Sequence, residues 1–314
     1  MMATALTIGN FDGVHHGHAA LIRAARRAVG PGGRVVVLTF DPHPAVVLRP
    51  EAVPPRLGTL EQRTGWLLAL GADVVERLDP AAGVLGMTAE AFVTWFTGRF
   101  TPSVVVEGPD FRFGRGREGD LETLRSLGAS RGFRTVRVEP VFRPLVDHQV
   151  VRVSSSRIRR LLADGRVRDA AMLLGRPLEI TGRVIPGERR GRTIQVPTAN
   201  LDHGDRMLPA DGVYAGLATD PEGRWFPAAV SVGRKPTFGG GVARVCEVHL
   251  VDWAGPSDLY GWTMRLRPVH WLRGMMRFDG VESLVRQLRR DIDRTRRLMR
   301  PERATARLAE EISA

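Results

Sequence analysis

The stretch GNFDGVHHGHAALI, residues 9–22, joins two apolar segments through glycines, one asparagine, one aspartate and three histidines. The preceding ALTI has the composition of a short buried strand, and in the segment that follows Ile22, Ala25 and Val29 recur at helical spacing. We therefore expect a strand-to-helix turn here. Backbone N–H groups and the helix dipole attract phosphate to such a turn, and histidines can donate hydrogen bonds to its oxygens. Metal ligation and a plain surface loop are the alternatives, but no partner carboxylate or cysteine lies at a zinc-site spacing.

The first half of the chain alternates strand-like and helix-like segments. RVVVLTF at 34–40 predicts a buried strand, and Thr88 is a typical N-cap for the helix that follows it. This alternation predicts a parallel sheet with helices on both faces. After about residue 180, short strand-like runs follow one another without helices between them, which predicts an antiparallel barrel or sandwich. We place the domains at 1–178 and 179–314. One long helix is expected to close the chain, with an apolar stripe at Val281, Leu284, Val285, Leu288, Ile292 and Leu298.

Composition bounds the class of protein. The chain has 314 residues, 43% of them hydrophobic, and a net charge of +12. Of its 46 basic residues only Lys235 is a lysine, and the arginines are scattered and interleaved with acids, so we expect no nucleic-acid partner. No segment is apolar enough for a bilayer and we find no secretory signal, so we expect a cytoplasmic protein without a membrane partner. A single cysteine, Cys246, excludes an internal disulfide framework.

Two further segments of the first half have binding character. In VSSSRIRRLLADG, Ser154–Ser156 precede a predicted helix and can cap it or hold phosphate, while Arg159 can add a forked contact to phosphate. A plain N-cap is the alternative for the serines alone. EGPDFRFGRGREGD, at 107–120, follows a strand and predicts a ligand-facing loop in which Phe111 and Phe113 offer ring faces.

Three features of the second half suit phosphoryl transfer. GRVIPGERRGRTIQVPTANL, residues 182–201, has the glycines and arginine of a phosphate loop, without the spacing or lysine of a Walker A motif. Thr198 and Asn200 can hold Mg²⁺ through oxygen. Glu247 stands in a strand-like run, where it is either exposed by alternation or placed to take a proton from a substrate hydroxyl.

These motifs carry a resemblance. H-x-G-H at the start of a helix resembles the signature of the nucleotidyltransferase superfamily, which includes the class I aminoacyl-tRNA synthetases, but a chain with one lysine lacks their lysine motif. GNFDGVHHGH, TFDPHP, GPDFRFGRGREGD and SSSRIR resemble, in order and spacing, the adenylyltransferase module of bacterial bifunctional riboflavin kinase/FAD synthetases. GRVIPGERRGRTIQVPTANL, SVGRKPTFGGG and RVCEVHLVDW are similar to the kinase module of the same family. The resemblance covers about residues 5–298.

The resemblance implies a fold and a set of roles. The fold is α/β plus β: a Rossmann-like nucleotidyltransferase domain with a parallel sheet, then a six-stranded antiparallel β-barrel and a closing C-terminal helix. ATP, riboflavin and FMN are the implied substrates and Mg²⁺ the implied cofactor, and a homo-oligomer is allowed. His15 and His18 would stabilise the α-phosphate that FMN attacks, and Glu247 would be the general base of the kinase. The implied ATP-binding residues are Gly9, Asn10, Phe11, Gly17, Ser155, Ser156, Arg159, Gly187, Gly191, Arg192, Thr198 and Asn200. The implied flavin-binding residues are Asp12, Asp110, Phe111, Phe113 and Arg273. The implied metal ligands are Thr198 and Asn200.

Departures from the family pattern keep other hypotheses open. Ile194, Gln195 and Val196 stand where the family usually has Leu-Gly-Phe, and Met275 stands where it often has an acid. The main alternative is therefore an FMN adenylyltransferase whose degenerate kinase domain only binds flavin. The others are a different small-molecule nucleotidyltransferase, which is generally a single domain, and a flavin- or nucleic-acid-binding protein without catalysis.

Overall fold

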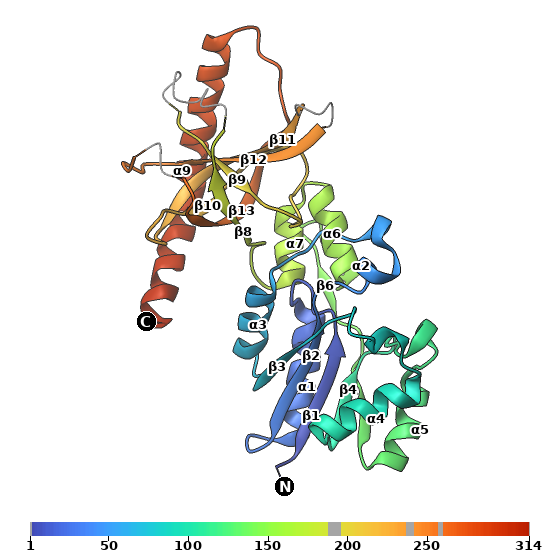
Figure 1. The fold of residues 1–314 in the computed structure, drawn as a ribbon. Helices are drawn as coiled ribbons and strands as arrows, with labels where there is room; N and C mark the ends of the chain where they lie inside the picture. Colours follow the sequence, from blue (N-terminus) through green and yellow to red (C-terminus); the bar gives the residue numbers. More distant parts are fainter. Residues whose placement is uncertain (1, 188–195, 237–241, 257–259, 314) are drawn as a thin grey trace. The chain divides into compact units, whose positions relative to one another are not determined.

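The structure is a computed structural model that describes residues 2–187, 196–236, 242–256 and 260–313 (Figure 1). The chain forms two compact units. The first comprises Met1–Pro144 with His148–Ser155, and the second comprises Leu145–Asp147 with Ser156–Ala314. The boundary between residues 178 and 179 that we infer from the sequence stays a prediction.

The first unit is built on a five-stranded parallel sheet (Figure 1). Its strand order is β3-β2-β1-β4-β5, so the direction in which strands are added reverses between β1 and β4. Ligands bind at such a reversal, at the carboxyl ends of the strands. The predicted parallel sheet is confirmed. Its strands are β1 (Thr4–Gly9), β2 (Arg34–Phe40), β3 (Val74–Leu78), β4 (Val104–Glu107) and β5 (Arg134–Arg137).

Helices cover both faces of this sheet, as predicted. On one face Leu6, Val36 and Val105 pack with residues of α4 and α5, and on the other Val35 and Val37 pack with residues of α1 and α3. Because both faces are buried, these strands are continuously β-branched or apolar rather than alternating. The Thr88 hydroxyl caps α4 by accepting from the Ala91 N–H at 3.2 Å. The four helices are α1 (His16–Val29), α3 (Leu60–Ala69), α4 (Ala89–Phe100) and α5 (Leu121–Arg131).

Several short elements complete this part of the chain. The sequence predicted the helix α6 (Ser155–Ala163) but placed all three serines before it, whereas Ser155 and Ser156 are its first residues. The remaining elements did not show in the hydrophobic pattern because they are only one or two turns long or lie at the surface. They are α2 (Ala45–Leu48), the 3₁₀ turns Pro50–Ala52, Val84–Gly86 and Arg115–Arg117, the hairpin β6 (Phe142–Pro144) and β7 (Val150–Arg152), and α7 (Val167–Leu174).

The second unit contains a closed six-stranded antiparallel barrel with the order β10-β11-β12-β9-β8-β13. Five of its strands match the predicted strand-like runs. The sixth, β9, contains Asn200 and is only four residues long, two of them polar, so its pattern does not predict a strand. Pairing with β8 on one side and β12 on the other supplies its hydrogen bonds. The strands are β8 (Ile180–Ile185), β9 (Ala199–Asp202), β10 (Gly212–Thr219), β11 (Trp225–Pro236), β12 (Val242–Leu250) and β13 (Thr263–Arg273).

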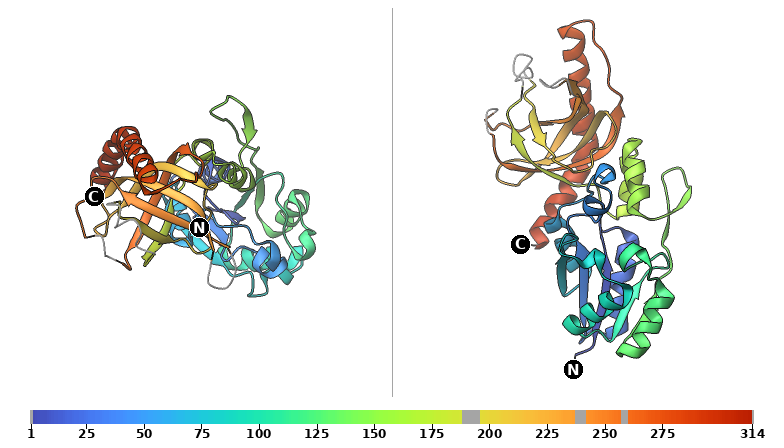
Figure 2. Two further views of the ribbon diagram at one scale, coloured as in Figure 1. Left: turned by 90° about the horizontal axis from the view of Figure 1, so that it is seen from above. Right: turned by 45° about the vertical axis from the view of Figure 1, so that its right-hand side comes forward.

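The helix α9 (Val281–Ser313) runs beside the barrel, where Met299 packs against Val213 and Leu217 of β10 (Figure 2). The predicted helix is confirmed, but its stripe differs at the start because Val281 is 63% exposed. Within the described residues, no helix combines the length and the apolar composition needed to cross a membrane.

A mostly buried ion pair ties α9 to the end of β13. The Arg273 guanidinium donates to one Asp291 oxygen at 3.0 and 2.8 Å, and Gln287 donates to the other oxygen at 2.9 Å. The side chains of Arg273 and Asp291 are 17% and 7% exposed. Removal of either partner would leave an uncompensated charge in a poorly hydrated place.

We expect Asp291→Ala to lower the free energy of unfolding of the barrel by about 3 kcal/mol, because Arg273 then loses its counter-charge. Urea denaturation followed by tryptophan fluorescence measures this. The matched control is Asp293→Ala on the same helix, whose side chain is 62% exposed and pairs with Arg296, and which should cost less than about 1 kcal/mol. Equal losses in the two variants would contradict the expectation.

Candidate active sites

The N-terminus of α1 is capped by two histidines that bond each other's backbone. The His15 Nδ1 atom accepts from the His18 N–H at 3.3 Å, and the His18 Nδ1 atom accepts from the His15 N–H at 3.3 Å. Their rings stack, with centroids 3.7 Å apart. Because each Nδ1 is an acceptor, the proton of each neutral ring lies on Nε2. The turn therefore holds two stacked rings that carry their protons on Nε2 when neutral.

The backbone leading into this helix is held in an unusual conformation. Phe11 and Val14 have φ values of 45° and 38°, in the left-handed region that favours glycine. Both side chains are buried, and the Phe11 ring lies 5.0 Å from the His18 ring, centroid to centroid. Burial of these two side chains offsets the cost of the left-handed backbone and places the histidines.

Gly17 is required by the same arrangement. A Cβ atom at this position would lie 3.1 Å from two atoms of the His15 ring. Any larger residue would therefore displace the His15 ring, which also stacks on His18. The glycine of H-x-G-H makes room for a side chain, although it stands in a helix, where glycine is normally unfavourable.

Residues that precede the histidines connect this turn to neighbouring segments. Both carboxylate oxygens of Asp12 accept from the Leu57 N–H, at 3.0 and 3.1 Å, and the Ser155 hydroxyl donates to the Asp12 carbonyl at 2.8 Å. Asp12 is 7% exposed. The predicted flavin ligand Asp12 thus holds the segment before α3, and Ser155, predicted to bind phosphate, lies beside the histidine turn.

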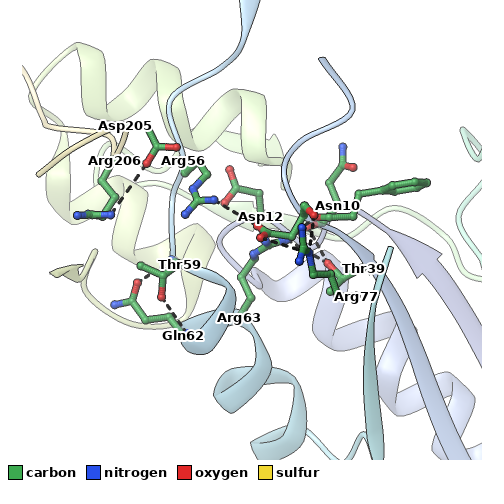
Figure 3. Close-up of polar contacts among 12 residues, drawn as sticks. Asn10, Asp12, Thr39, Arg56, Thr59, Gln62, Arg63, Arg77, Asp205 and Arg206 are labelled. Atoms are coloured by element: carbon green, nitrogen blue, oxygen red, sulfur yellow. Dashed lines mark hydrogen bonds and ion pairs between the residues drawn. The ribbon is translucent and has the colours of Figure 1, made fainter. Parts of the chain in front are cut away.

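A buried arginine organises the carboxyl edge of β1 and β2 (Figure 3). Arg63 Nη1 donates to the Asn10 carbonyl at 2.7 Å, to the Thr39 hydroxyl at 3.1 Å and to the Phe40 carbonyl at 3.0 Å, and Nη2 pairs with Asp41. Burial lowers the pKa of Arg63, and the Asp41 carboxylate opposes that effect. The sequence motif TFDPHP contains Asp41, for which the sequence predicted no role. Its partner Arg63 showed no sequence signal, because a single arginine on a helix is ordinarily solvated.

The loop after β4 divides its two aromatic residues between core and surface. Phe113 is buried and packs against Phe92, and the Phe111 ring stacks on it with centroids 5.4 Å apart. Asp110 is largely exposed and pairs with Arg152. Of the residues predicted here to bind flavin, Asp110 and Phe111 lie nearer the surface, and Phe113 anchors the loop.

Glu107 extends the contact between β1 and β4 beyond their short ladder. The paired residues stop at Leu6 and Val105, and the Glu107 carboxyl accepts from the Ile8 N–H at 2.6 Å and from the Thr7 hydroxyl at 3.3 Å. The side chain is 3% exposed, and burial raises the pKa of Glu107 well above its usual range. The sequence did not indicate this residue.

The second unit has a cavity of about 280 Å³ between the outer face of β9, β11 and β12 and the start of α9. It is mainly apolar, with a polar end formed by Thr198, Asn200, Lys235 and Glu247. This combination of apolar walls with a few polar groups is typical of a small-molecule site. The lining residues are Val196, Thr198, Asn200, Val213, Ala229, Val230, Ser231, Lys235, Glu247, His249, Arg273, Met275, Met276, Phe278, Leu284, Leu288, Asp291 and Ile292.

Strand pairing brings the predicted kinase residues together. Asn200 of β9 stands opposite Glu247 of β12, and the His249 Nδ1–H donates to the Pro197 carbonyl at 2.8 Å. Burial lowers the pKa of His249. A Cβ atom on Gly187 would lie 1.9 Å from the Asn200 amide, so backbone and amide are in close contact there. The predicted ATP ligands Gly191 and Arg192 lie outside the described residues.

The oxygen donors of this cavity suit Mg²⁺. Within the described ranges, no group of three or more histidine, cysteine, aspartate or glutamate side chains gathers as a complete metal cage. Mg²⁺ needs no such cage, because it keeps several waters and takes one or two protein oxygens together with substrate phosphates. Thr198 and Asn200 offer a hydroxyl and an amide oxygen on the polar side of the cavity.

Comparison with known proteins matches both units. Residues 174–299 match the family model described as riboflavin kinase, and residues 2–157 match the one described as FAD synthetase. A bifunctional riboflavin kinase/FMN adenylyltransferase of Escherichia coli K12 is 35% identical over 91% of this chain and 90% of its own length. The chain belongs to this bifunctional family. The Pseudomonas fluorescens member is 35% identical over 94% of this chain and 93% of its own length.

A solved structure shares the whole architecture of this family member. It is described as a macrolide-efflux protein from Streptococcus pneumoniae, has a TM-score of 0.82 and 32% identity, and the match covers 94% of each chain. The order of a parallel-sheet unit and a barrel along one chain is therefore common to both proteins. The predicted fold and family are confirmed, while the roles of individual residues stay predictions.

We expect Gly17→Ala to slow adenylyl transfer about 10-fold, because the added methyl group displaces the His15 ring by a few tenths of an ångström. Initial rates of FAD formation from FMN and ATP measure this. Gly65→Ala is the matched control: Gly65 lies inside α3 with no atom within 4 Å of the new methyl group, so the rate should stay unchanged and the helix should gain stability. Equal rates in wild type and Gly17→Ala would contradict the expectation.

A second prediction concerns the pH dependence of stability. The neutral Glu107 carboxyl stabilises the folded state fully below its ordinary pKa of 4.5, and this contribution is lost as the pH rises toward the raised folded value. Glu107→Gln does not titrate. Its stability relative to wild type should therefore rise by about 1.4 kcal/mol per pH unit above about pH 4.5.

Urea denaturation of both proteins from about pH 4 to about pH 7 tests this. Glu90→Gln, which changes a glutamate whose side chain is 70% exposed, is the control and should show a nearly constant difference from wild type. A constant difference for Glu107→Gln as well would show that the carboxyl is ionised in the folded protein.

Proposed function

We propose that this chain makes FMN from riboflavin and ATP in its barrel and then joins FMN to the AMP moiety of a second ATP in its N-terminal unit, releasing pyrophosphate. Both activities are those of the bifunctional family to which the chain belongs. The observation that supports the proposal best is the reciprocal His15–His18 cap, which lies at the end of β1, where the strand order reverses, and would let both rings donate from Nε2–H to a phosphate.

In adenylyl transfer, an oxygen of the FMN phosphate attacks the α-phosphorus of ATP and pyrophosphate leaves. Negative charge grows on the α-phosphate oxygens, and the Nε2–H groups of His15 and His18 offset it. Ser155, Ser156 and Arg159, at the start of α6, would hold the departing phosphates. No covalent enzyme intermediate is needed, so positioning and charge stabilisation account for the catalysis.

In the kinase reaction, the riboflavin hydroxyl oxygen attacks the γ-phosphorus of ATP, its proton passes to Glu247, and ADP leaves. The apolar walls of the barrel cavity would hold the flavin ring, next to the polar end where Glu247 lies. Thr198 and Asn200 would hold Mg²⁺, which supplies charge neutralisation of the ATP phosphates when bound. Removal of the general base Glu247 should lower the rate of the kinase reaction by a factor of about 10²–10⁴.

The alternative with a degenerate kinase domain is not supported, because the riboflavin kinase family model matches residues 174–299 despite Met275. A small-molecule nucleotidyltransferase of a single domain is not supported either, because the second unit is a complete closed barrel. Cytoplasmic location, the absence of a nucleic-acid partner and the oligomeric state stay predictions from the sequence.

The test is product chromatography with purified protein, ATP and Mg²⁺, in parallel tubes that start from riboflavin and from FMN. Wild type should give FAD in both tubes. Glu247→Gln should lower FMN formation from riboflavin by about 10²–10⁴ and leave FAD formation from FMN intact. His18→Ala should reverse this pattern, so that riboflavin gives FMN that is not converted to FAD.

His16→Ala is the matched control, because His16 occupies the variable position of H-x-G-H and should leave both tubes near wild type. FAD from FMN alone in the wild type would restore the adenylyltransferase-only hypothesis. Absence of any flavin product from both wild-type tubes would overturn the proposed function.

A further inference from the structure

The only lysine in the chain lies against the proposed general base of the kinase. The Lys235 Nζ atom is 2.8 Å from Glu247 Oε1, and both residues line the barrel cavity. The other 45 of the 46 lysine and arginine residues are arginines. The sequence shows that the lysine is unique, but not that it meets Glu247, because the two residues are on different strands.

This pair does not follow from the sheet register alone. The residue opposite Glu247 is Ser231, and the residue opposite Lys235 is Ala243, so the two partners are four residues apart along the ladder. The β11 position between Ser231 and Lys235 on the same face is Gly233, which has no side chain to fill the space between them. The Met275 side chain lies over this glycine, since a Cβ atom there would be 3.2 Å from the Met275 Cε atom, and the Lys235 and Glu247 side chains lean along the strands toward each other.

A contribution to stability does not explain the contact. The Lys235 and Glu247 side chains are 36% and 26% exposed, and ion pairs at that level of exposure add little to the free energy of folding. What the position does supply is a flexible cation beside the atom that receives the proton. An ammonium group has three donors on a four-carbon stem and can change partners by rotating.

On the basis of the proposed kinase activity, we propose that Lys235 is a catalytic cation that first orients Glu247 and then neutralises charge on the transferring phosphoryl group. The hydroxyl oxygen forms a bond to the γ-phosphorus, the bond from that phosphorus to the bridging oxygen breaks, and ADP leaves with the electron pair. The hydroxyl proton goes to Glu247.

The ammonium lies 2.8 Å from Glu247, and the reaction would bring the phosphoryl group close to the same carboxylate. A general base must lie about 3 Å from the hydroxyl oxygen, and the phosphoryl group becomes bonded to that same oxygen. As Glu247 takes the proton it loses its negative charge and with it its attraction for Lys235. The ammonium is then drawn to the phosphoryl oxygens, which keep their charge.

The test uses the full chain, which contains its own control activity. Lys235→Met should lower kcat for FMN formation from riboflavin about 100-fold, with KM for riboflavin changed less than about 3-fold. FAD formation from FMN by the same variant should equal wild type. Lys235→Arg keeps the charge with different geometry, and its kcat for FMN formation should be at least about 10-fold higher than that of Lys235→Met.

Arg234→Met is the matched control, because the neighbouring Arg234 pairs with Asp211, is 68% exposed and does not line the cavity. Its kinase kcat should stay near wild type. An unchanged kcat in Lys235→Met, or a rise in KM alone, would overturn this inference. In that case an active wild type would still support the proposed function. A wild type that forms no FMN would overturn both.

Chemical modification of the wild type gives a second test that does not depend on folding of a variant. Acetylation removes the charge of the Lys235 amine, whereas reductive methylation keeps it, and mass spectrometry measures the extent at this single lysine. Acetylated protein should lose FMN formation and keep FAD formation from FMN, and methylated protein should keep much more of both. Full acetylation at Lys235 with unchanged FMN formation would overturn the inference.

Discussion

The hydrogen bonds exchanged by His15 and His18 fix the conformation of the turn that begins the first helix. The start of a helix leaves backbone N–H groups that need acceptors. Most helices satisfy them with a hydroxyl or carboxylate, but here two imidazole Nδ1 atoms do so. This choice assigns the proton of each neutral ring to Nε2. The same two bonds thus begin the helix and set the tautomer of both histidines.

The surrounding residues serve this arrangement. Gly17 leaves space for the His15 ring, and burial of the Phe11 and Val14 side chains holds a left-handed backbone in place. Arg63 gathers the carbonyls at the edge of β1 and β2, and Glu107 takes the Ile8 N–H where the β1–β4 ladder ends. These buried polar contacts at the strand ends keep one edge of the sheet in a single conformation.

The barrel obtains its site by a different route. Closure of six strands places Asn200 opposite Glu247, and the cation of Lys235 reaches the same carboxylate from two ladder positions away on that face. The Arg273–Asp291 pair, which also lines the cavity, fixes the start of α9 against the end of β13. The cavity therefore has charged pairs at its edges and apolar side chains in its walls, which suits a ligand with a flat apolar ring and a polar chain.

Local pattern determined much of this protein. Continuous β-branched runs, the Thr88 cap and the spacing of H-x-G-H were enough to predict the parallel sheet, its helices and the histidine turn, because these depend on neighbours within a few residues. Only the tertiary structure decided that Ser155 begins a helix and bonds Asp12, that the tetrapeptide ANLD becomes β9, that Phe113 enters the core, and that the single lysine meets Glu247. Each of these depends on a partner distant in sequence. The residues that flank either side chain do not predict that such a contact forms.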